Sequence, residues 1–310
     1  MAVPVRNDGT CGYLGPQGTY TEEAASRVAP DQRLVPLVSI ERVFEAVANG
    51  EVSQGVVPVE NLIQGPVTEA LDCLYEYADR IVLAGMILLP IRHALGAKSE
   101  DEAISRIYSK DQALKQCSLF LSGNYPAATL HETTSTSAPM REIAAGRLPN
   151  AAVVGGVEAL RRHGLRVIAD DIGNIKENKT KFAVIASAQE RASRRTGADS
   201  TLCVVYPRRD RVGLLRTVVE VVSGQYGLNL SAIHSRPDTR GAFRFFLEVE
   251  GHMSDASLVG CVDSLRNELR GEDVDVVVVG SYPRTSFIEK RLEKVVLGQS
   301  TDVAEPDSTG

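Results

Sequence analysis

The chain has 310 residues, 43% of them hydrophobic, and a formal net charge of −6. This length and apolar content suffice for two or three domains with hydrophobic cores. An acidic chain is not expected to bind nucleic acid, whose phosphates attract clustered Lys and Arg. No apolar run approaches the ~18 residues of a membrane span, and the N-terminal residues lack the apolar segment of a signal peptide. We therefore expect a soluble, cytoplasmic protein.

The cysteines are odd in number and widely scattered: Cys11, Cys73, Cys117, Cys203 and Cys261. None has the C-x-x-C spacing of a zinc site or a redox motif. We expect buried, reduced thiols, with neither a metal site nor a disulfide framework.

Strand-like and helix-like segments alternate from Cys11 to about Ser187, which predicts an α/β protein. The spacing of Thr19 and Glu22 indicates a capping box before the first helix. The apolar run 81–90 is too long for one short strand, so we expect it to leave a first lobe and enter a second. The elements expected before that run are strands at 11–15, 34–38 and 55–59 and helices at 21–28, 40–48 and 68–77.

The following residues repeat the same order of elements. Expected strands are 106–109, 128–132, 151–154 and 165–169; expected helices are 111–121, 133–145 and 157–163. The chain then crosses back and closes with a strand at 181–186. Two lobes joined by crossings near 88–92 and 172–180 would enclose a ligand-binding cleft. The alternation of strands and helices also predicts mostly parallel sheets.

A polar linker at 189–200 precedes a βαββαβ pattern over 201–283, which predicts a ferredoxin-like domain of about eighty residues. Its expected strands are 202–206, 228–234, 243–249 and 274–280, and its expected helices are 213–223 and 256–269. In the remaining residues, 284–310, a further helix is compatible with 286–296. The acidic Gly/Ser/Pro end from Gly298 has the composition of a disordered tail.

Two segments far apart in the sequence carry most of the polar chemistry. Val57-Pro58-Val59-Glu60-Asn61 and Asn178-Lys179-Thr180-Lys181-Phe182 each lie at the end of an apolar, strand-like run. Open α/β sheets place ligand-binding groups at such ends. Together the segments offer a carboxylate, two amides, a hydroxyl and an ammonium, which suit a small, polar, anionic substrate.

Further motifs accompany these two segments: Tyr13-Leu14-Gly15-Pro16-Gln17-Gly18-Thr19-Tyr20, Gly65, Ile107-Tyr108-Ser109 with Gln116, Ser135-Thr136, and Gly227-Leu228-Asn229-Leu230 running into Ser235-Arg236-Pro237. In order and spacing, the chain resembles the prephenate dehydratase family over almost its whole length. The resemblance implies a catalytic domain over 11–188, made of two periplasmic-binding-protein-like lobes of type II, followed by a regulatory ACT domain.

The reaction implied by the resemblance converts prephenate to phenylpyruvate, water and carbon dioxide in L-phenylalanine biosynthesis, without a cofactor or a metal. No chorismate mutase domain is expected, because only ten residues precede the first strand. By resemblance Thr180 is the catalytic residue, which would donate a hydrogen bond or a proton to the departing hydroxyl. The residues expected to bind or orient the substrate are Thr19, Glu60, Asn61, Gln116, Ser135, Thr136, Asn178 and Lys181.

The resemblance also implies L-phenylalanine as an effector. It further implies a homodimer or homotetramer held at least partly by the ACT domain, with no nucleic-acid or membrane partner. The residues expected near bound phenylalanine are Gly213, Leu214, Asn229, Leu230, His234, Ser235, Arg236 and Pro237.

The chain departs from the family pattern at several positions. Lys181 stands where the family has arginine, and a point charge grips a carboxylate less specifically than a planar fork. His234 replaces a glutamate and Leu214 an alanine, which bears on feedback control. Leu62 stands where serine is frequent, and Pro139 lies in a stretch that is usually rich in alanine.

Several residues also have purely structural explanations. Asn61 could end a strand in an Asx-turn, and Ser135 and Thr136 could only cap a helix. Thr180 could be an ordinary strand residue, and His93 and His163 are expected at the surface or in packing.

Two other functions stay open from the sequence. A non-aromatising prephenate decarboxylase of a secondary pathway is favoured by Lys181 and disfavoured by Thr180. A non-catalytic amino-acid sensor built from the same lobes is disfavoured by the complete polar set.

Overall fold

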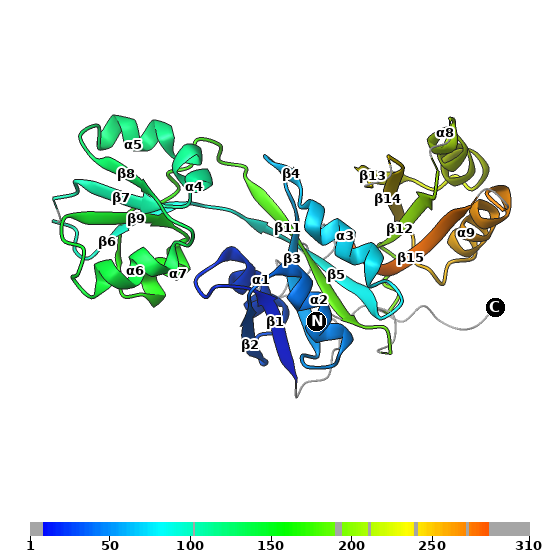
Figure 1. Cartoon of the computed structure of the whole chain (residues 1–310), viewed down its shortest axis with the longest axis horizontal. Coiled ribbons are helices and arrows are strands. Elements are labelled where there is room, and N and C mark those ends of the chain that lie inside the picture. The colour runs from blue at the N-terminus through cyan, green and yellow to red at the C-terminus, as the bar shows by residue number, and fades with distance from the viewer. Residues whose placement is uncertain are drawn as a thin grey trace, which may run out of the picture. The chain divides into compact units, whose positions relative to one another are not determined.

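The computed structural model describes residues 9–101, 103–189, 194–209, 212–238, 241–270 and 273–284. The chain divides into two compact units, Met1–Val82 with Leu88–Arg191 and Leu83–Ile87 with Ala192–Gly310 (Figure 1). The helix predicted over 286–296 and the tail after it lie outside the described residues.

The first lobe is built on a six-stranded sheet of order β2-β1-β3-β11-β5, with β4 beside β3. Its strands are β1 (Thr10–Leu14), β2 (Arg33–Leu37), β3 (Gln54–Asn61), β4 (Gly65–Pro66), β5 (Ile81–Pro90) and β11 (Lys179–Ser187). Its helices are α1 (Tyr20–Val28), α2 (Ile40–Ala48) and α3 (Thr68–Glu76). The apolar residues of α2 recur at helical spacing, and Ile40, Val43, Phe44 and Val47 are all buried.

The second lobe has a five-stranded sheet of order β10-β6-β9-β7-β8. Its strands are β6 (Ala94–Ala97), β7 (Arg106–Ser109), β8 (Thr129–Glu132), β9 (Ala151–Gly155) and β10 (Arg166–Ala169). Helices α4 (Asp111–Gln116) and α5 (Ser118–Asn124) lie on one side, and α6 (Ser137–Ala144) and α7 (Val157–Arg162) on the other (Figure 1). All five residues of β9 are buried, as expected for a strand covered on both faces.

Two features of these lobes differ from the sequence-based expectations. The helix predicted over 111–121 is interrupted at Cys117, whose φ of −112° and ψ of 9° are not helical. The sheets are mixed rather than mostly parallel. Strand β1 pairs in parallel with β2 and β3, and β7 with β8 and β9. The pairs β3–β11, β6–β9 and β6–β10 are antiparallel, because they involve the strands that flank the crossings between the lobes.

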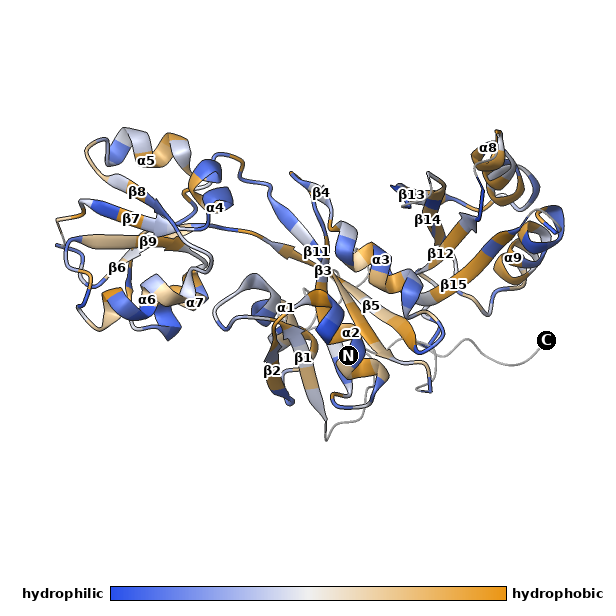
Figure 2. Ribbon diagram, in the orientation of Figure 1, coloured by the Kyte–Doolittle hydropathy of each residue, from blue (hydrophilic) through white to orange (hydrophobic). Residues whose placement is uncertain are grey.

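The ferredoxin-like unit consists of β12 (Asp199–Pro207), α8 (Leu214–Val219), η1 (Glu220–Gln225), β13 (Leu230–Pro237), β14 (Phe243–Glu250), α9 (Ala256–Glu268) and β15 (Val274–Pro283). Its antiparallel sheet has the order β13-β14-β12-β15, which confirms the predicted βαββαβ fold. One layer of helices covers the sheet, and Figure 2 shows apolar residues along β12 and β15.

All five cysteines are buried and none is in a disulfide. Burial raises the pKa of the Cys11 and Cys117 thiols to about 12 each, so these groups stay protonated and unreactive near neutral pH. Within the described residues, no group of three or more His, Cys, Asp and Glu side chains is placed to hold a metal ion. In the same part of the chain, every helix is too short or too polar to cross a bilayer.

Gly55 of β3 provides a test of the packing between α2 and the first sheet. A Cβ atom there would lie 2.6 Å from Val43 Cγ1 and 3.0 Å from Val47 Cγ2. Gly55→Ala should therefore lower the free energy of unfolding by ~1–3 kcal/mol. Gly123→Ala in α5 is the control, since no atom in the described part of the chain lies within 4 Å of its added Cβ. Denaturation of the full chain followed by circular dichroism measures both, and equal stability of the two variants would contradict the packing argument.

Candidate active site

The two polar segments predicted from the sequence meet through the β3–β11 pair. Asn61 at the end of β3 lies opposite Thr180 in antiparallel register, and each is 8% exposed. Asn61 Nδ2 donates to Thr180 Oγ1 at 2.9 Å and to Asn178 Oδ1 at 2.9 Å. Residues separated by 117 and 119 positions in the sequence thus form one buried polar cluster.

The orientation of the Asn61 amide is fixed by the backbone. Its Oδ1 accepts the N–H groups of Ile63 and Gln64, each at 3.1 Å. Because this oxygen already faces two donors, Nδ2 must face Thr180 and Asn178. The Asx-turn that the sequence offered as a structural explanation is therefore present, and it orients the amide for the cluster.

The bond from Asn61 determines what the Thr180 hydroxyl can do. An amide N–H only donates, so Thr180 Oγ1 accepts and keeps its own proton for another partner. Among the residues that the structure describes, no acceptor takes that proton. A buried hydroxyl held in this way is a preorganised hydrogen-bond donor.

The cluster extends into the second lobe through Asn178. Its Oδ1 faces Asn61, and its Nδ2 lies 3.4 Å from Gln116 Oε1 at the C-terminal end of α4. His93 Nε2 lies 2.8 Å from the same Gln116 oxygen. His93 is buried, and burial lowers the pKa of its imidazole, whereas the bond to Gln116 raises it.

His93 is the cluster member that the sequence analysis missed, because it was assigned only a surface or packing role. A lone histidine has no spacing pattern that marks it as functional. Its position directly after the crossing predicted near 88–92 was the one available signal.

Backbone hydrogen bonds fix the segments that carry these side chains. Ile91 N donates to Asn178 O at 2.8 Å, which joins the two crossings. Ile172 N donates to His93 O at 2.8 Å, and Asn174 N donates to Gln116 O at 2.7 Å. The polar side chains therefore stand on backbone that is held at both crossings.

Glu60 and Lys181 lie opposite each other at the next position of the β3–β11 pair. Successive side chains of a strand point to opposite faces, so this pair projects from the face opposite Asn61 and Thr180. The register shifts immediately afterwards, between Lys181 and Phe182, and leaves Val59 without a partner. The structure thus groups Glu60 with Lys181 on a separate face from the Thr180 hydroxyl.

Thr19 has the predicted capping role at the start of α1. Its Oγ1 accepts the Glu22 N–H at 3.3 Å, and the Glu22 carboxylate accepts the Gly18 N–H at 2.7 Å. The return bond of the capping box therefore goes to Gly18 rather than to Thr19 itself.

Ser135 and Thr136, both half-buried, precede α6 in the second lobe. Thr136 occupies the N-cap position but makes no side-chain capping bond, so the cap-only explanation does not hold for it. The next residue, Ser137, donates from Oγ to the Gln17 carbonyl. This bond joins the loop that follows β1 to the start of α6.

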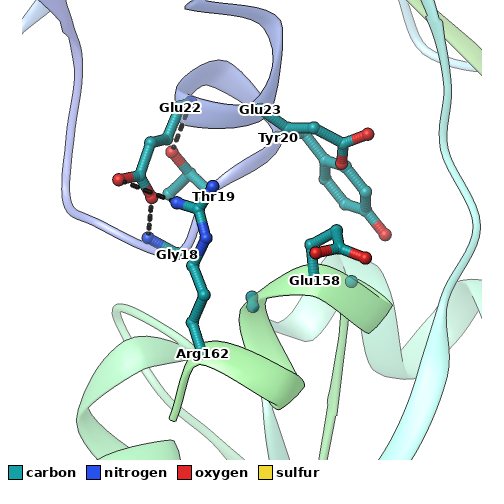
Figure 3. Close-up of a pocket in the computed structure, with 9 residues that line it drawn as sticks. Gly18, Thr19, Tyr20, Glu22, Glu23, Glu158 and Arg162 are labelled. Carbon is teal, nitrogen blue, oxygen red and sulfur yellow. Dashed lines mark hydrogen bonds and ion pairs between the residues drawn. The ribbon is translucent and has the colours of Figure 1, made fainter. Parts of the chain in front are cut away.

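A small pocket lies between α1 and α7, and Figure 3 shows how Glu22, Glu23 and Glu158 surround it. Arg162 Nη1 lies 3.1 Å from Glu22 Oε1, so the guanidinium already faces a carboxylate (Figure 3). Three carboxylates against one cation make this pocket unfavourable for an anionic ligand. Thr19 lines it, and the backbone N–H of Gly18 is occupied by Glu22.

The residues predicted for effector binding lie at several places in the ferredoxin-like unit. Gly213 precedes α8 with a φ of +85°, and no atom of the described residues lies within 4 Å of a Cβ built there. Strand β13, an edge of the sheet, contains Leu230, His234, Ser235, Arg236 and Pro237, and Asn229 directly precedes it. Leu214 is buried in the core of the unit.

Taken together, these features define an α/β protein with two periplasmic-binding-protein-like lobes and a ferredoxin-like domain. Residues 11–190 match the family model described as prephenate dehydratase. The chain belongs to the prephenate dehydratase family, as its motifs predicted, and is an enzyme of that type.

Curated relatives and solved structures agree with this assignment. The chain is 35% identical over 281 residues to the bifunctional chorismate mutase/prephenate dehydratase of Aquifex aeolicus, covering 89% of this chain and 74% of that protein. It is 29% identical over 297 residues to the prephenate dehydratase of Amycolatopsis methanolica, covering 94% of this chain and 95% of that protein. The prephenate dehydratase of Arthrobacter aurescens, solved in complex with L-Phe, superposes with a TM-score of 0.79 at 28% identity, covering 93% of this chain and 100% of that one. The prephenate dehydratase of Staphylococcus aureus superposes with a TM-score of 0.71 at 26% identity, covering 88% of this chain and 99% of that one.

Proposed function

We propose that the chain converts prephenate to phenylpyruvate, water and carbon dioxide, with the Thr180 hydroxyl assisting the departure of hydroxide. The observation that carries this proposal is the bond from Asn61 Nδ2 to Thr180 Oγ1, which leaves the threonine proton for the substrate. Prephenate must lose its ring carboxylate and its C4 hydroxyl, and aromatisation favours the step. Hydroxide is a poor leaving group, so a donor aimed at the departing oxygen lowers the barrier.

The partners of Thr180 indicate how it acts. Its described side-chain partner is an amide, which neither supplies nor removes a proton at neutral pH. Thr180 therefore stabilises the charge that develops on the departing oxygen by hydrogen bonding. The C–C bond to the carboxylate breaks, its electron pair enters the ring, and the C–O bond pair leaves with the hydroxide, which takes its proton from solvent. Burial strengthens this hydrogen bond, because the local dielectric is low.

The remaining predicted residues serve binding and orientation in this proposal. Gln116 and Asn178 orient the substrate from the Thr180 side, and Ser135 and Thr136 offer hydroxyls from the second lobe. Glu60 and Lys181 act from the other face of the β3–β11 pair, where each is the cross-strand neighbour of the other. Thr19 acts through the loop that it caps rather than as a binder of a carboxylate.

Incubation of the purified full chain with prephenate tests the proposed function directly. Formation of phenylpyruvate supports it. A non-aromatic keto acid as product would identify a prephenate decarboxylase, and absence of any turnover would identify a sensor.

Removal of the Thr180 hydroxyl is the first kinetic prediction. Thr180→Val should lower kcat by at least ~10²-fold with little change in KM, because the lost hydrogen bond forms mainly in the transition state. Thr180→Ser is the matched control and should keep substantial activity, since it keeps the hydroxyl. Steady-state kinetics measure both. An unchanged kcat in Thr180→Val would remove this residue from the mechanism.

Asn61→Asp is the second kinetic prediction, and it tests the direction of the bond to Thr180. Aspartate can keep the turn, because one carboxylate oxygen still accepts the Ile63 and Gln64 N–H groups. The other oxygen replaces Nδ2, so the Thr180 hydroxyl would donate to Asp rather than to the substrate. We expect kcat to fall at least ~10²-fold, as in Thr180→Val. If kcat fell by less than half, the proposed orientation of the hydroxyl would be wrong.

We also propose a domain organisation for this function. A catalytic domain over 11–188 is joined by the linker 189–200 to an ACT domain over 201–283, and residues 284–310 follow.

The protein acts in the cytoplasm as a homodimer or homotetramer assembled at least partly through the ACT domain. Among the described residues β13 is an edge strand of its sheet, and an edge strand can pair with that of a second copy, which supports this assembly. A truncation after Ala188 that stayed fully oligomeric would contradict this assembly.

L-Phenylalanine is the proposed effector, as the complex of the Arthrobacter aurescens relative suggests. Gly213 supports a ligand's close approach to the backbone, because among the described residues no atom lies within 4 Å of the position of its missing Cβ. His234 replaces the glutamate of the family pattern and removes a negative partner for an amino group.

We expect calorimetry to show that the chain binds L-phenylalanine and that Gly213→Val weakens this binding at least ~10-fold. The valine side chain would occupy the space beside Gly213 and would strain a backbone with positive φ. An inhibition assay with both proteins checks it, and identical affinities would exclude this position from the effector site.

A further inference from the structure

The hydrogen-bond directions in the cluster propagate from Asn61 to Gln116. Two backbone N–H groups hold Asn61 Oδ1, so Asn61 Nδ2 donates to Asn178 Oδ1. Asn178 therefore turns its Nδ2 toward the second lobe, where the group that it meets is Gln116 Oε1. The order of oxygen and nitrogen in all three amides is thus determined by one backbone turn.

The tautomer of His93 follows from the same sequence of bonds. Gln116 Oε1 can only accept, so His93 must carry a proton on Nε2 to bond at 2.8 Å. Its other ring nitrogen, Nδ1, lies 3.3 Å from the Tyr20 hydroxyl, whose shorter bond of 2.7 Å goes to the Arg92 carbonyl. The Tyr20 ring packs edge-on against the imidazole at 5.8 Å between ring centroids. His93 is therefore held on both sides.

One donor of the cluster has no acceptor. Gln116 Nε2 is buried, and within the described residues it has no hydrogen-bond partner. The amide cannot rotate to relieve this, because its oxygen is held by both His93 and Asn178. A buried N–H₂ group that neighbouring side chains keep unpaired is a group presented to a ligand.

We propose that His93 is a positioning residue for the reaction, which donates from Nε2 to Gln116 Oε1 and thereby directs the Gln116 N–H₂ group toward an oxygen of the substrate. The inference rests on the proposed function, since the substrate supplies the missing acceptor. Prephenate offers carboxylate, hydroxyl and keto oxygens, and each accepts an N–H donor. His93 itself need not touch the substrate, because it acts through Gln116.

Two His93 variants separate a positioning role from a packing role. His93→Phe keeps an aromatic ring against Tyr20 but removes the donor. His93→Gln loses the ring but can place an amide N–H near the position of Nε2. For the full chain with prephenate, we expect His93→Phe to lower kcat/KM at least ~10-fold and His93→Gln to recover most of that loss. A packing role predicts the reverse order, with the glutamine variant the more impaired.

A double-mutant cycle tests whether His93 acts through Gln116. Gln116→Met removes the amide and keeps an unbranched side chain of similar length. In the Gln116→Met background, His93→Phe should change kcat/KM by less than ~2-fold, since no amide is left to orient. An equal loss in both backgrounds would overturn the proposal, as would a wild-type kcat/KM for His93→Phe alone. Thermal denaturation checks that each variant is folded, and His93→Leu replaces His93→Phe in the cycle if the latter is not.

Failure of the proposed function can be distinguished from failure of this inference. If the wild-type chain forms no phenylpyruvate, the proposed function is wrong. The same cycle is then measured by calorimetry with prephenate. Coupling of His93 and Gln116 in prephenate affinity would still support the positioning role, and additive effects or absence of binding would overturn it.

Discussion

The polar cluster depends on one interaction, the Asx-turn in which Asn61 Oδ1 accepts the N–H groups of Ile63 and Gln64. A side-chain amide has two nearly isosteric orientations, and surrounding donors and acceptors select one. The turn selects the orientation of Asn61, and through it those of Asn178 and Gln116 and the tautomer of His93. It also makes Thr180 an acceptor from Asn61, so its hydroxyl proton points elsewhere. One local backbone feature therefore sets the chemistry of side chains on four separate segments.

The cluster is costly for the folded chain unless a ligand completes it. A buried donor without a partner costs about 1–3 kcal/mol, and Gln116 Nε2 is in that position. Proteins commonly retain such an unpaired buried group at functional sites, where binding or catalysis requires an arrangement that lowers the stability of the fold. The bonds from His93 and Asn178 to the Gln116 oxygen keep the amide from turning over to relieve this cost. A substrate oxygen that accepts from Gln116 gains affinity because it meets a donor already desolvated and oriented.

The sequence predicted the elements well where hydrophobic period and cap residues decide them, as in α2 with its buried stripe and α1 with Thr19 and Glu22. It also predicted that Asn61 and Thr180 would belong to one site, because each lies at an end of an apolar strand, Asn61 at the end of β3 and Thr180 near the start of β11. It could not predict that Glu60 and Lys181 lie on the other face. That placement depends on a strand register fixed by pairing across more than a hundred residues, together with a bulge at Val59. The role of His93 was equally hidden, since only tertiary contacts give a lone histidine a partner.

The bond lengths divide the cluster into two parts. Asn61, Asn178 and Thr180 are joined by bonds of 2.9 Å on the first-lobe sheet and the segment that leads into it. Gln116 belongs to α4 of the second lobe and meets Asn178 only at 3.4 Å, near the limit of a hydrogen bond. The hydroxyl donor is therefore fixed by the first lobe, whereas the amide donor is carried by the second. His93, on the crossing between them, makes the shorter bond of 2.8 Å to Gln116. His93 therefore holds in place, through its shorter bond, the Gln116 orientation that the Asn61 turn selects. In this way a residue linked to Thr180 only through other side chains can control how the substrate is presented to it.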